Sequence, residues 1–255
     1  KFERGGIYRF TVDVTKGNTK AVLTVEKVGK VDLPAPDIFF GNSKMEVTDT
    51  DIYKSDQVFT RGQMITVTGI DNLNEWWIDP DFFEKQSDGT LKFLPINGDY
   101  RVTANGILKY FSVIALKDGK PAKLQDDGTG AIWAIGKGIG KPSVTSSEVG
   151  WETGKALCLA QVAPKKYQLT LKAGETLKTS GDWEAISFKF FYQNDWGGEF
   201  SNYASNTLVE QLKLTGSGNL EMQDNKAFEE GGVYRFTIDV TNGNANAILK
   251  VEKIN

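Results

Sequence analysis

The residues best suited to chemistry are aromatic and polar side chains in the C-terminal half of the chain. Trp151 follows a glycine, Trp183 follows a Ser-Gly-Asp turn, and Trp196 lies between an aspartate and two glycines. An indole gives a sugar ring a large rigid face at small entropic cost, and nearby amide, ammonium and phenol groups can bond its hydroxyls. The sequence therefore predicts a carbohydrate-binding site that comprises Trp151, Trp183, Lys189, Tyr192, Asn194 and Trp196.

Packing is the competing interpretation for each of these side chains. Trp151 and Trp183 suit binding and packing about equally, and Trp196 suits either a platform or a plug at the end of a sandwich. Lys189 would by default be a solvated lysine. Trp133 follows Ile132 in an apolar run and is predicted to lie in the core.

Catalysis has few candidate residues in this chain. There is no histidine, which excludes Ser-His-Asp and Cys-His mechanisms and the usual zinc ligands. A glycosidase would need two acids across a cleft, and the pairs Asp182/Glu184 and Asp195/Glu199 flank tryptophans. Acids beside aromatic residues also line non-catalytic sugar sites, so we predict that the protein is not an enzyme. A carboxylate-dependent glycoside hydrolase is the less favoured alternative.

Metal and cofactor sites are not predicted. The acidic clusters are Asp49-Thr50-Asp51, Asp79-Pro80-Asp81 and Asp126-Asp127-Gly128. None has the spacing of a twelve-residue calcium loop, so we interpret all three as solvated turns. The single cysteine, Cys158, lies in an apolar run and is predicted to be a buried thiol.

Composition is that of a soluble globular protein of two modules. The chain has 255 residues and a net charge of −3, which does not favour binding to nucleic acid or to a membrane surface. No signal peptide or transmembrane run is visible in the sequence. Because the first residues already lie inside a repeat, we expect further sequence upstream of Lys1.

The repeat links the two ends of the chain. Residues 2–28 align without a gap on residues 228–254, and 98–116 is a looser third copy. Apolar and polar residues alternate on either side of a Gly-Asn turn, which is typical of a β-hairpin with one buried face. A lone hairpin is marginally stable, so we expect each copy to close a larger sheet. For 1–30, we expect the hairpin to dock on the next domain or to complete a sheet in a neighbouring molecule.

The remaining sequence predicts an all-β chain of tandem β-sandwich modules. We assign 1–30 to a hairpin left from a preceding repeat, 31–37 to a linker, 38–117 to one module and 129–255 to another. Within the middle module, 81–87 is the segment that could hold a helical turn, and no segment of the chain has a sustained helical period. Trp76 and Trp77 are adjacent and would face opposite ways on a strand, and we expect packing between modules for them before glycan contact.

Three short motifs in 129–255 occur in the order found in a known family. They are Trp133-Ala134-Ile135-Gly136, then Leu171–Glu175 ahead of Phe188-Lys189-Phe190 and Asp195-Trp196-Gly197, and finally Gly232–Asp239. In these motifs the last module resembles the SusE/SusF-like outer-membrane proteins of Bacteroidetes polysaccharide-utilisation systems. The middle module resembles N-terminal domains of Bacteroidetes surface lipoproteins more loosely.

The resemblance implies several properties. They are immunoglobulin-like β-sandwiches, glycan binding at exposed aromatics without catalysis, and a lipid anchor at the outer membrane on the cell surface. It also implies a polysaccharide or oligosaccharide ligand and a complex with an outer-membrane transporter. The anchoring cysteine is not in this sequence, and we expect it upstream. The main alternative function is a structural or protein-interaction spacer, in which the tryptophans are internal.

Overall fold

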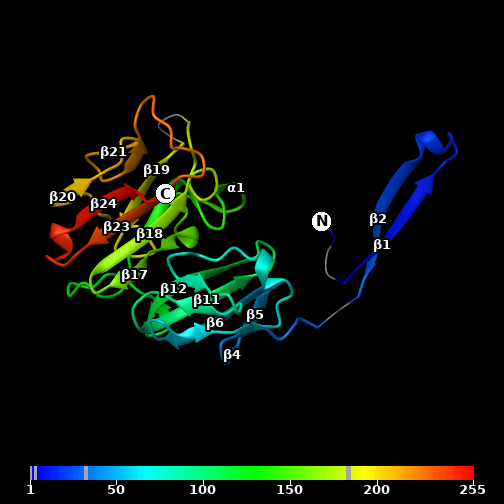
Figure 1. Ribbon diagram of the computed structural model, residues 1–255, viewed down its shortest axis with the longest axis horizontal. Helices are drawn as coiled ribbons and strands as arrows, with labels where there is room; N and C mark the ends of the chain where they lie inside the picture. Colours follow the sequence, from blue (N-terminus) through cyan, green and yellow to red (C-terminus); the bar gives the residue numbers. More distant parts are fainter. Residues whose placement is uncertain (1, 3–4, 32–33, 182–184) are drawn as a thin grey trace. The chain divides into compact units, whose positions relative to one another are not determined.

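The computed structural model describes residues 2, 5–31, 34–181 and 185–255 (Figure 1). The chain divides into two compact units, Lys1–Pro36 and Asp37–Asn255. Among the described residues, the only α-helix is the four-residue α1 (Val144–Ser147), and nearly all other regular structure is strand. The prediction of an all-β chain built from β-sandwich modules is therefore confirmed.

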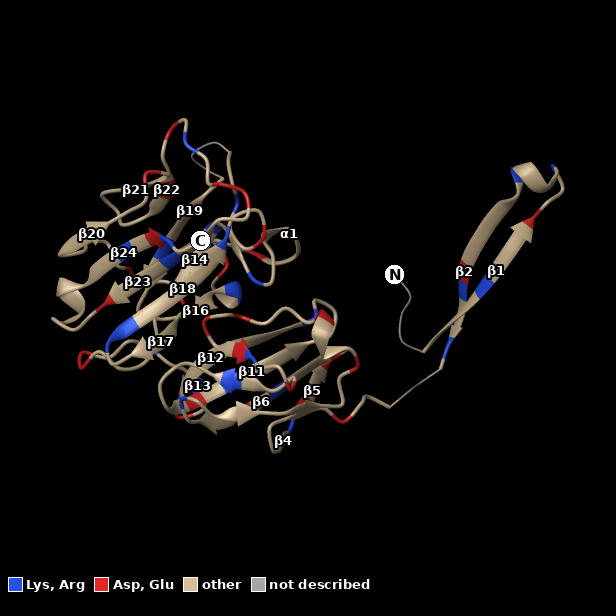
Figure 2. Ribbon diagram, in the orientation of Figure 1, with Lys and Arg blue, Asp and Glu red and all other residues tan. Residues whose placement is uncertain are grey.

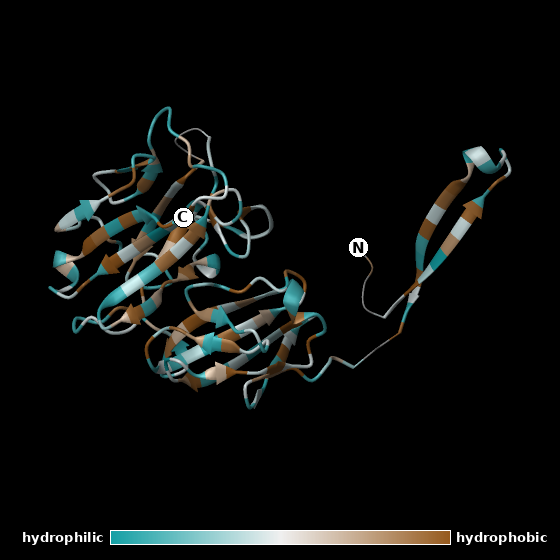
Figure 3. Cartoon of the chain, viewed as in Figure 1, coloured by the Kyte–Doolittle hydropathy of each residue, from teal (hydrophilic) through white to brown (hydrophobic). Residues whose placement is uncertain are grey.

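The first unit is a single antiparallel hairpin. It consists of β1 (Gly6–Asp13) and β2 (Val22–Lys30), joined by a turn that contains the 3₁₀ segment η1 (Asn18–Lys20). Figure 3 shows hydrophobic residues along both strands. Most of these side chains are exposed in the first unit, where β1 and β2 form a sheet of two strands.

The second unit begins with the middle module, a set of three small sheets. Its largest sheet has the order β13-β12-β11-β6-β5, and the others are β7-β10-β9 and β4-β3-β8. The strands are β3 (Phe39–Phe40), β4 (Ser43–Lys44), β5 (Glu46–Asp49), β6 (Ile52–Phe59), β7 (Met64–Ile65), β8 (Val67–Thr68), β9 (Phe83–Lys85), β10 (Leu91–Phe93), β11 (Gly98–Asn105), β12 (Tyr110–Lys117) and β13 (Lys120–Pro121). A cluster of buried aromatic rings around Phe40, Phe59 and Phe93 fills the space between the sheets.

The last module consists of two principal sheets. One has the order β15-β14-β19-β22-β21 with β16 also pairing β14, and the other has the order β17-β18-β23-β24-β20. The strands are β14 (Trp133–Gly140), β15 (Glu148–Gly150), β16 (Leu157–Cys158), β17 (Ala160–Ala163), β18 (Lys166–Lys172), β19 (Ser187–Phe191), β20 (Ser205–Thr207), β21 (Leu212–Leu214), β22 (Leu220–Met222), β23 (Val233–Asp239) and β24 (Ile248–Lys253). The core lies between the sheets, where Phe188 of β19 meets Phe236 of β23 with ring centroids 5.5 Å apart.

Short 3₁₀ segments occupy several loops, namely η2 (Leu73–Glu75), η3 (Thr153–Lys155) and η4 (Asn244–Asn246). The helical turn predicted within 81–87 lies earlier, because the Phe83 amide donates to the Asp79 carbonyl at 2.9 Å. Residues Phe83–Lys85 then form β9, so the prediction for 81–87 was wrong beyond its first residues. None of the helices in the described part of the chain is long and apolar enough to cross a membrane.

Buried contacts join the middle and last modules. Ala160 and Val162 of β17 pack into the hydrophobic core of the middle module. Lys141 of the last module is buried and pairs with Asp79 and Asp81, with its Nζ 2.7 Å from Asp79 Oδ2 and 3.2 Å from Asp81 Oδ2. The interpretation of Asp79-Pro80-Asp81 as a solvated turn was therefore wrong for both carboxylates.

Candidate functional site

Two of the predicted tryptophans come together at the edge of the last module. Trp151 follows Gly150, the last residue of β15, and Trp196 lies on the loop that leaves β19. Their ring centroids are 6.3 Å apart and the ring planes meet at 27°. Trp196 is 52% exposed, whereas Trp151 is partly buried, so the pair presents one open indole supported by a second.

The loop that carries Trp196 is held by its own hydrogen bonds. The Tyr192 amide donates to the Gly198 carbonyl at 2.7 Å, which closes the loop on the end of β19. The Trp196 amide donates to Asp195 Oδ1 at 2.8 Å, and Gln193 Nε2 donates to the Trp196 carbonyl at 2.7 Å. These bonds fix the backbone at Trp196, so the position of its side chain is restricted before any ligand arrives.

A buried phenylalanine supports the exposed ring from below. The edge of one ring meets the face of the other between Phe191 and Trp196, with centroids 6.0 Å apart and planes at 75°. Phe191 is the last residue of β19, and Lys189 is two positions earlier, so both side chains leave the sheet on the same face. The partly exposed Lys189 therefore shares a sheet face with the residue beneath Trp196.

The other predicted binding residues are arranged differently. Tyr192 packs edge-on against the buried Phe200, with ring centroids 4.2 Å apart, and burial raises the pKa of its hydroxyl. It contributes to packing behind the loop. Asn194 is partly buried in the loop, and no hydrogen bond of its side chain is found among the described residues. Trp183 lies outside the described residues, as do Asp182 and Glu184.

Two expectations about buried groups are confirmed, for Trp133 and Cys158, and the expected packing between modules is found for Trp77 but not for Trp76. Trp133 is 2% exposed, and its Nε1 donates to the Ala122 carbonyl at 3.0 Å. Cys158 is a buried free thiol, and burial raises its pKa to about 12. Trp76 stacks on Phe111 in the middle module, whereas Trp77 reaches the last module, where its Nε1 donates to Glu175 Oε1 at 2.7 Å.

Residues that sequence reasoning missed at this site are Gln193, Asp195 as a loop acceptor, and Phe191. Residues alternate along β19, which puts Phe191 on the sheet face that points away from the other sheet of the module. A phenylalanine on that face, shortly before a loop that carries a tryptophan, could have indicated that it supports the indole. Of the acids considered for catalysis, Asp195 is engaged by the Trp196 amide. Among the described residues, no group of three metal-ligating side chains could hold a metal ion.

The buried carboxylates at the module junction have opposite pKa shifts. Burial opposes ionisation of Asp81, but Lys141 and hydrogen bonds from Thr170 and Gln168 outweigh this effect and lower its pKa. Burial raises the pKa of Asp79, and the neighbouring Asp81 charge adds to the shift. The ionised Asp81 therefore joins the middle module to β18, where the Thr170 amide donates to its Oδ2 at 2.6 Å.

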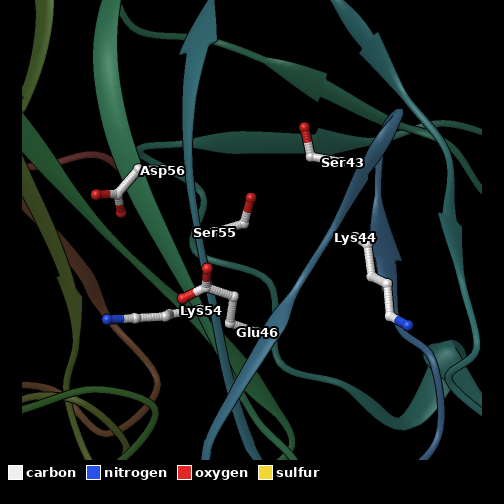
Figure 4. Close-up of a pocket in the computed structure, with 6 residues that line it drawn as sticks. All are labelled: Ser43, Lys44, Glu46, Lys54, Ser55 and Asp56. Carbon is white, nitrogen blue, oxygen red and sulfur yellow. The ribbon is translucent and has the colours of Figure 1, made fainter.

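A polar hollow in the middle module offers less for sugar binding (Figure 4). It is lined by Ser43, Lys44, Glu46, Lys54, Ser55 and Asp56. No aromatic face is present among these residues, and Asp56 is already paired with Arg101 at 2.7 Å. Figure 2 shows acidic and basic residues interspersed along the ribbon of the second unit.

Comparison with known proteins gives two family matches. Residues 127–241 match the family model described as a domain of unknown function, DUF5121, and residues 15–124 match that described as DUF5125. The second match includes part of the N-terminal hairpin and all of the middle module. No curated protein matches the chain.

Proposed function

We propose that the protein binds a polysaccharide or oligosaccharide without cleaving it. The observation that carries this proposal is the ring of Trp196, which is 52% exposed, stacked near Trp151 and supported from below by Phe191. Burying an indole inside a core is the ordinary outcome, so a half-exposed indole with a fixed backbone suits a ligand with a flat apolar face. A pyranose ring has such a face.

The chemistry of binding follows from the neighbours of Trp196. The sugar stacks on the open part of the indole, and Trp151 limits how far that ring can turn. Lys189, on the same sheet face as Phe191, donates to hydroxyl groups. Asn194 on the loop is the second hydrogen-bonding group in the proposal. Hydrolysis is not part of the proposal, and the contact seen for Asp195 is structural, since its Oδ1 accepts the Trp196 amide of its own loop.

Location and partners belong to the same proposal. The resemblance of 129–255 to SusE/SusF-like proteins supports a lipoprotein at the outer surface of the outer membrane. In that setting the protein would hold glycan for a transporter complex. Weak affinity at each site suffices when several modules on one chain contact the same polymer.

A spacer function has one specific observation in its favour. The middle and last modules are joined by the buried Lys141 ion pairs and by the Trp77–Glu175 hydrogen bond, which would hold them at a set angle. Rigid spacing and glycan binding differ in what they require of Trp196. Glycan binding requires its exposed ring as a contact surface for the sugar, whereas a spacer function does not require that ring to be exposed.

The test is affinity electrophoresis of the full chain through gels that contain plant or host polysaccharides. We expect at least one glycan to retard the wild type, and Trp196→Ala to abolish the retardation. Trp151→Ala should weaken it, because the supporting ring is lost. Met64→Ala is the control, since Met64 is 50% exposed on the middle module and lies in a different sheet.

The outcome separates the candidate functions. Retardation that is unchanged in Trp196→Ala would place binding elsewhere on the chain. No retardation by any glycan of the panel would remove the proposal and leave the spacer function. Release of reducing ends from a retained polysaccharide would show hydrolysis instead.

A further inference from the structure

A groove lies between the middle and last modules, on the side of the last module formed by β18 and β23. Its volume is about 390 Å³. We call it the junction groove, and it is lined by Trp77, Ile78, Pro80, Gln168, Thr170, Lys172, Glu175, Thr176, Val233, Arg235 and Ile254. It is distinct from the Trp151–Trp196 pair and shares no residue with it.

Arg235 on β23 is the unusual side chain in this groove. Its Nε is buried and has no hydrogen-bond partner, and no ion pair of its guanidinium is found among the described residues. A buried donor without a partner costs free energy, and a charged donor costs more than a neutral one. A partly exposed arginine without an ion pair on the wall of a groove suits a ligand that brings an acceptor to the accessible part of the guanidinium.

The N-terminal copy of the hairpin shows what this arginine would otherwise do. Arg9 is the equivalent of Arg235, and its Nη1 donates to Glu26 on the opposite strand at 2.7 Å. Glu252 lies opposite Arg235 in the same register. The cross-strand partner is therefore present in the C-terminal copy but does not pair with the arginine.

A lysine accounts for the difference between the copies. Glu252 is paired with Lys250, whose Nζ lies 2.6 Å from its Oε2. The residue equivalent to Lys250 in the N-terminal copy is Thr24, which carries no charge. Lys250 thus occupies the acid that would otherwise pair with Arg235, and the guanidinium remains free.

The other charges of the junction groove are already matched. Glu175 accepts from Trp77 Nε1 at 2.7 Å and pairs with Lys172 at 2.9 Å. Counting Lys172, Glu175 and Arg235, the lining has one unmatched positive charge. Because Arg235 presents its donors as a fixed fork, the acceptor of best fit is a planar carboxylate.

The walls of the groove are held in place before a ligand arrives. Trp77 is fixed by its bond to Glu175, and Lys141 Nζ lies 5.9 Å from the centroid of its ring. Asp81 bonds both the amide and the hydroxyl of Thr170, which links the two walls. A partly exposed indole and an unpaired guanidinium that line the same groove can together recognise a ring bearing a carboxylate.

We propose that the junction groove binds an acidic saccharide, with the carboxylate of a uronic acid on Arg235 and its sugar ring against Trp77. The indole, the amide of Gln168 and the hydroxyls of Thr170 and Thr176 favour a saccharide over an acidic peptide. This site is independent of the proposed function at Trp196, because different residues form it.

The experiment is isothermal titration calorimetry of the full chain with α-1,4-linked trigalacturonate, its methyl ester and triglutamate. We expect trigalacturonate to bind, and the uncharged ester and the peptide to bind at least about tenfold more weakly, the scale of one charge-assisted hydrogen bond. Arg235→Met, which keeps most of the side-chain volume, should lower the affinity for trigalacturonate by a similar factor. The melting temperature should not fall, since the guanidinium has no partner to lose.

Lys250→Thr is the more specific variant. It introduces the residue found at the equivalent position of the N-terminal copy, and position 250 does not line the groove. Glu252 is then free to pair with Arg235, and trigalacturonate affinity should fall although the arginine is intact. Lys213→Thr is the matched control, a lysine that pairs with Asp224 elsewhere on the module.

Three results would overturn the proposal. They are absence of trigalacturonate binding, equal affinity for the ester or the peptide, and unchanged affinity in Arg235→Met. Loss of binding in Trp196→Ala but not in Arg235→Met would place the acidic saccharide at the Trp196 ring, which supports the proposed function while removing this inference. Retained trigalacturonate binding in Trp196→Ala would support the junction groove even where the proposed function fails.

Discussion

Residues 2–28 and 228–254 have nearly the same sequence and form the same hairpin, yet their surroundings differ. Phe10 is 58% exposed in the first copy, and its equivalent Phe236 is fully buried in the second. Leu23 and Leu249 differ in the same way, at 62% and 0% exposure. The register is equivalent in both copies, since Phe10 lies opposite Val25 and Phe236 lies opposite Val251.

The difference lies in what flanks each hairpin. In the second unit β23 pairs with β18 and β24 pairs with β20, so the hairpin is the centre of a five-stranded sheet. Phe188 and Phe190 of the opposing sheet cover its apolar face. In the first unit, β1 pairs only with β2 among the described residues. The alternating sequence therefore specifies the hairpin, and the neighbouring sheets supply most of its stability.

The largest expected effect tests this comparison directly. Phe236→Ala should destabilise the second unit by about 3–5 kcal/mol, because it leaves a cavity among Phe188, Phe190 and their neighbours. Phe10→Ala removes the same side chain from an exposed position and should leave the unfolding of the second unit unchanged. Urea unfolding followed by tryptophan fluorescence measures this, since all six tryptophans lie in the second unit. Equal losses in the two variants would contradict the comparison.

The repeat and its alternation of apolar and polar residues made the two hairpins predictable from the sequence. Each strand of the two hairpins follows from a period-two pattern, and the buried position of Trp133 follows from the apolar run around it. Contacts between modules could not be predicted in this way. Asp79 and Asp81 looked like a solvated turn because their partners, Lys141 and Thr170, lie more than 50 residues away in sequence. A local pattern contains no information about such partners.

The candidate site shows the same limit. Glycines around Trp196 indicated a loop, and the structure has Gly197 and Gly198 at φ 83° and 70°, the left-handed region that glycine adopts without strain. The stacking of Trp151 and the support from Phe191 depend on how β15 and β19 lie in the sheet, and this order is not visible in the spacing. Arg235 was missed because Arg9 has the same neighbours in sequence, yet Arg9 pairs with Glu26 and Arg235 has no such pair in the described part of the chain.

A second prediction concerns β18, which pairs with β23 of the C-terminal hairpin and has no equivalent beside β1 in the described part of the first unit. Asp81 bonds the Thr170 amide on β18 and pairs with Lys141, so Asp81→Asn should destabilise the second unit by about 3 kcal/mol at pH 7. The Asp81 pKa is lowered in the folded state, so the unfolded chain takes up a proton first as the pH falls below about 4. The stability that Asp81 provides is therefore present at neutral pH and is lost in acid.

Urea unfolding between pH 3 and 7 measures this dependence. The difference between wild type and Asp81→Asn should narrow as the pH falls through the folded-state pKa. Asp79→Asn is the control. The pKa of Asp79 is raised, so the folded protein stabilises the ionised form of Asp79 less than that of Asp81. A difference that stays constant over the whole range would show that the Asp81 charge does not hold β18.

The smallest expected effect uses one glycine from each hairpin turn. Gly17 and Gly243 have almost the same backbone angles, φ 90° with ψ 157° and φ 91° with ψ 156°, a region that only glycine adopts readily. A Cβ at either position would meet no atom within 4 Å, so replacement by alanine tests strain without a clash. Gly243→Ala should destabilise the second unit by about 1–3 kcal/mol, whereas Gly17→Ala should leave that unit unaffected. Amide hydrogen exchange in β1 and β2 should rise in Gly17→Ala, because its strain falls on a hairpin that no other described strand supports. If Gly17→Ala lowered the unfolding free energy of the second unit as much as Gly243→Ala does, the two copies would share one cooperative fold, and the contrast between an open and an enclosed hairpin would not hold.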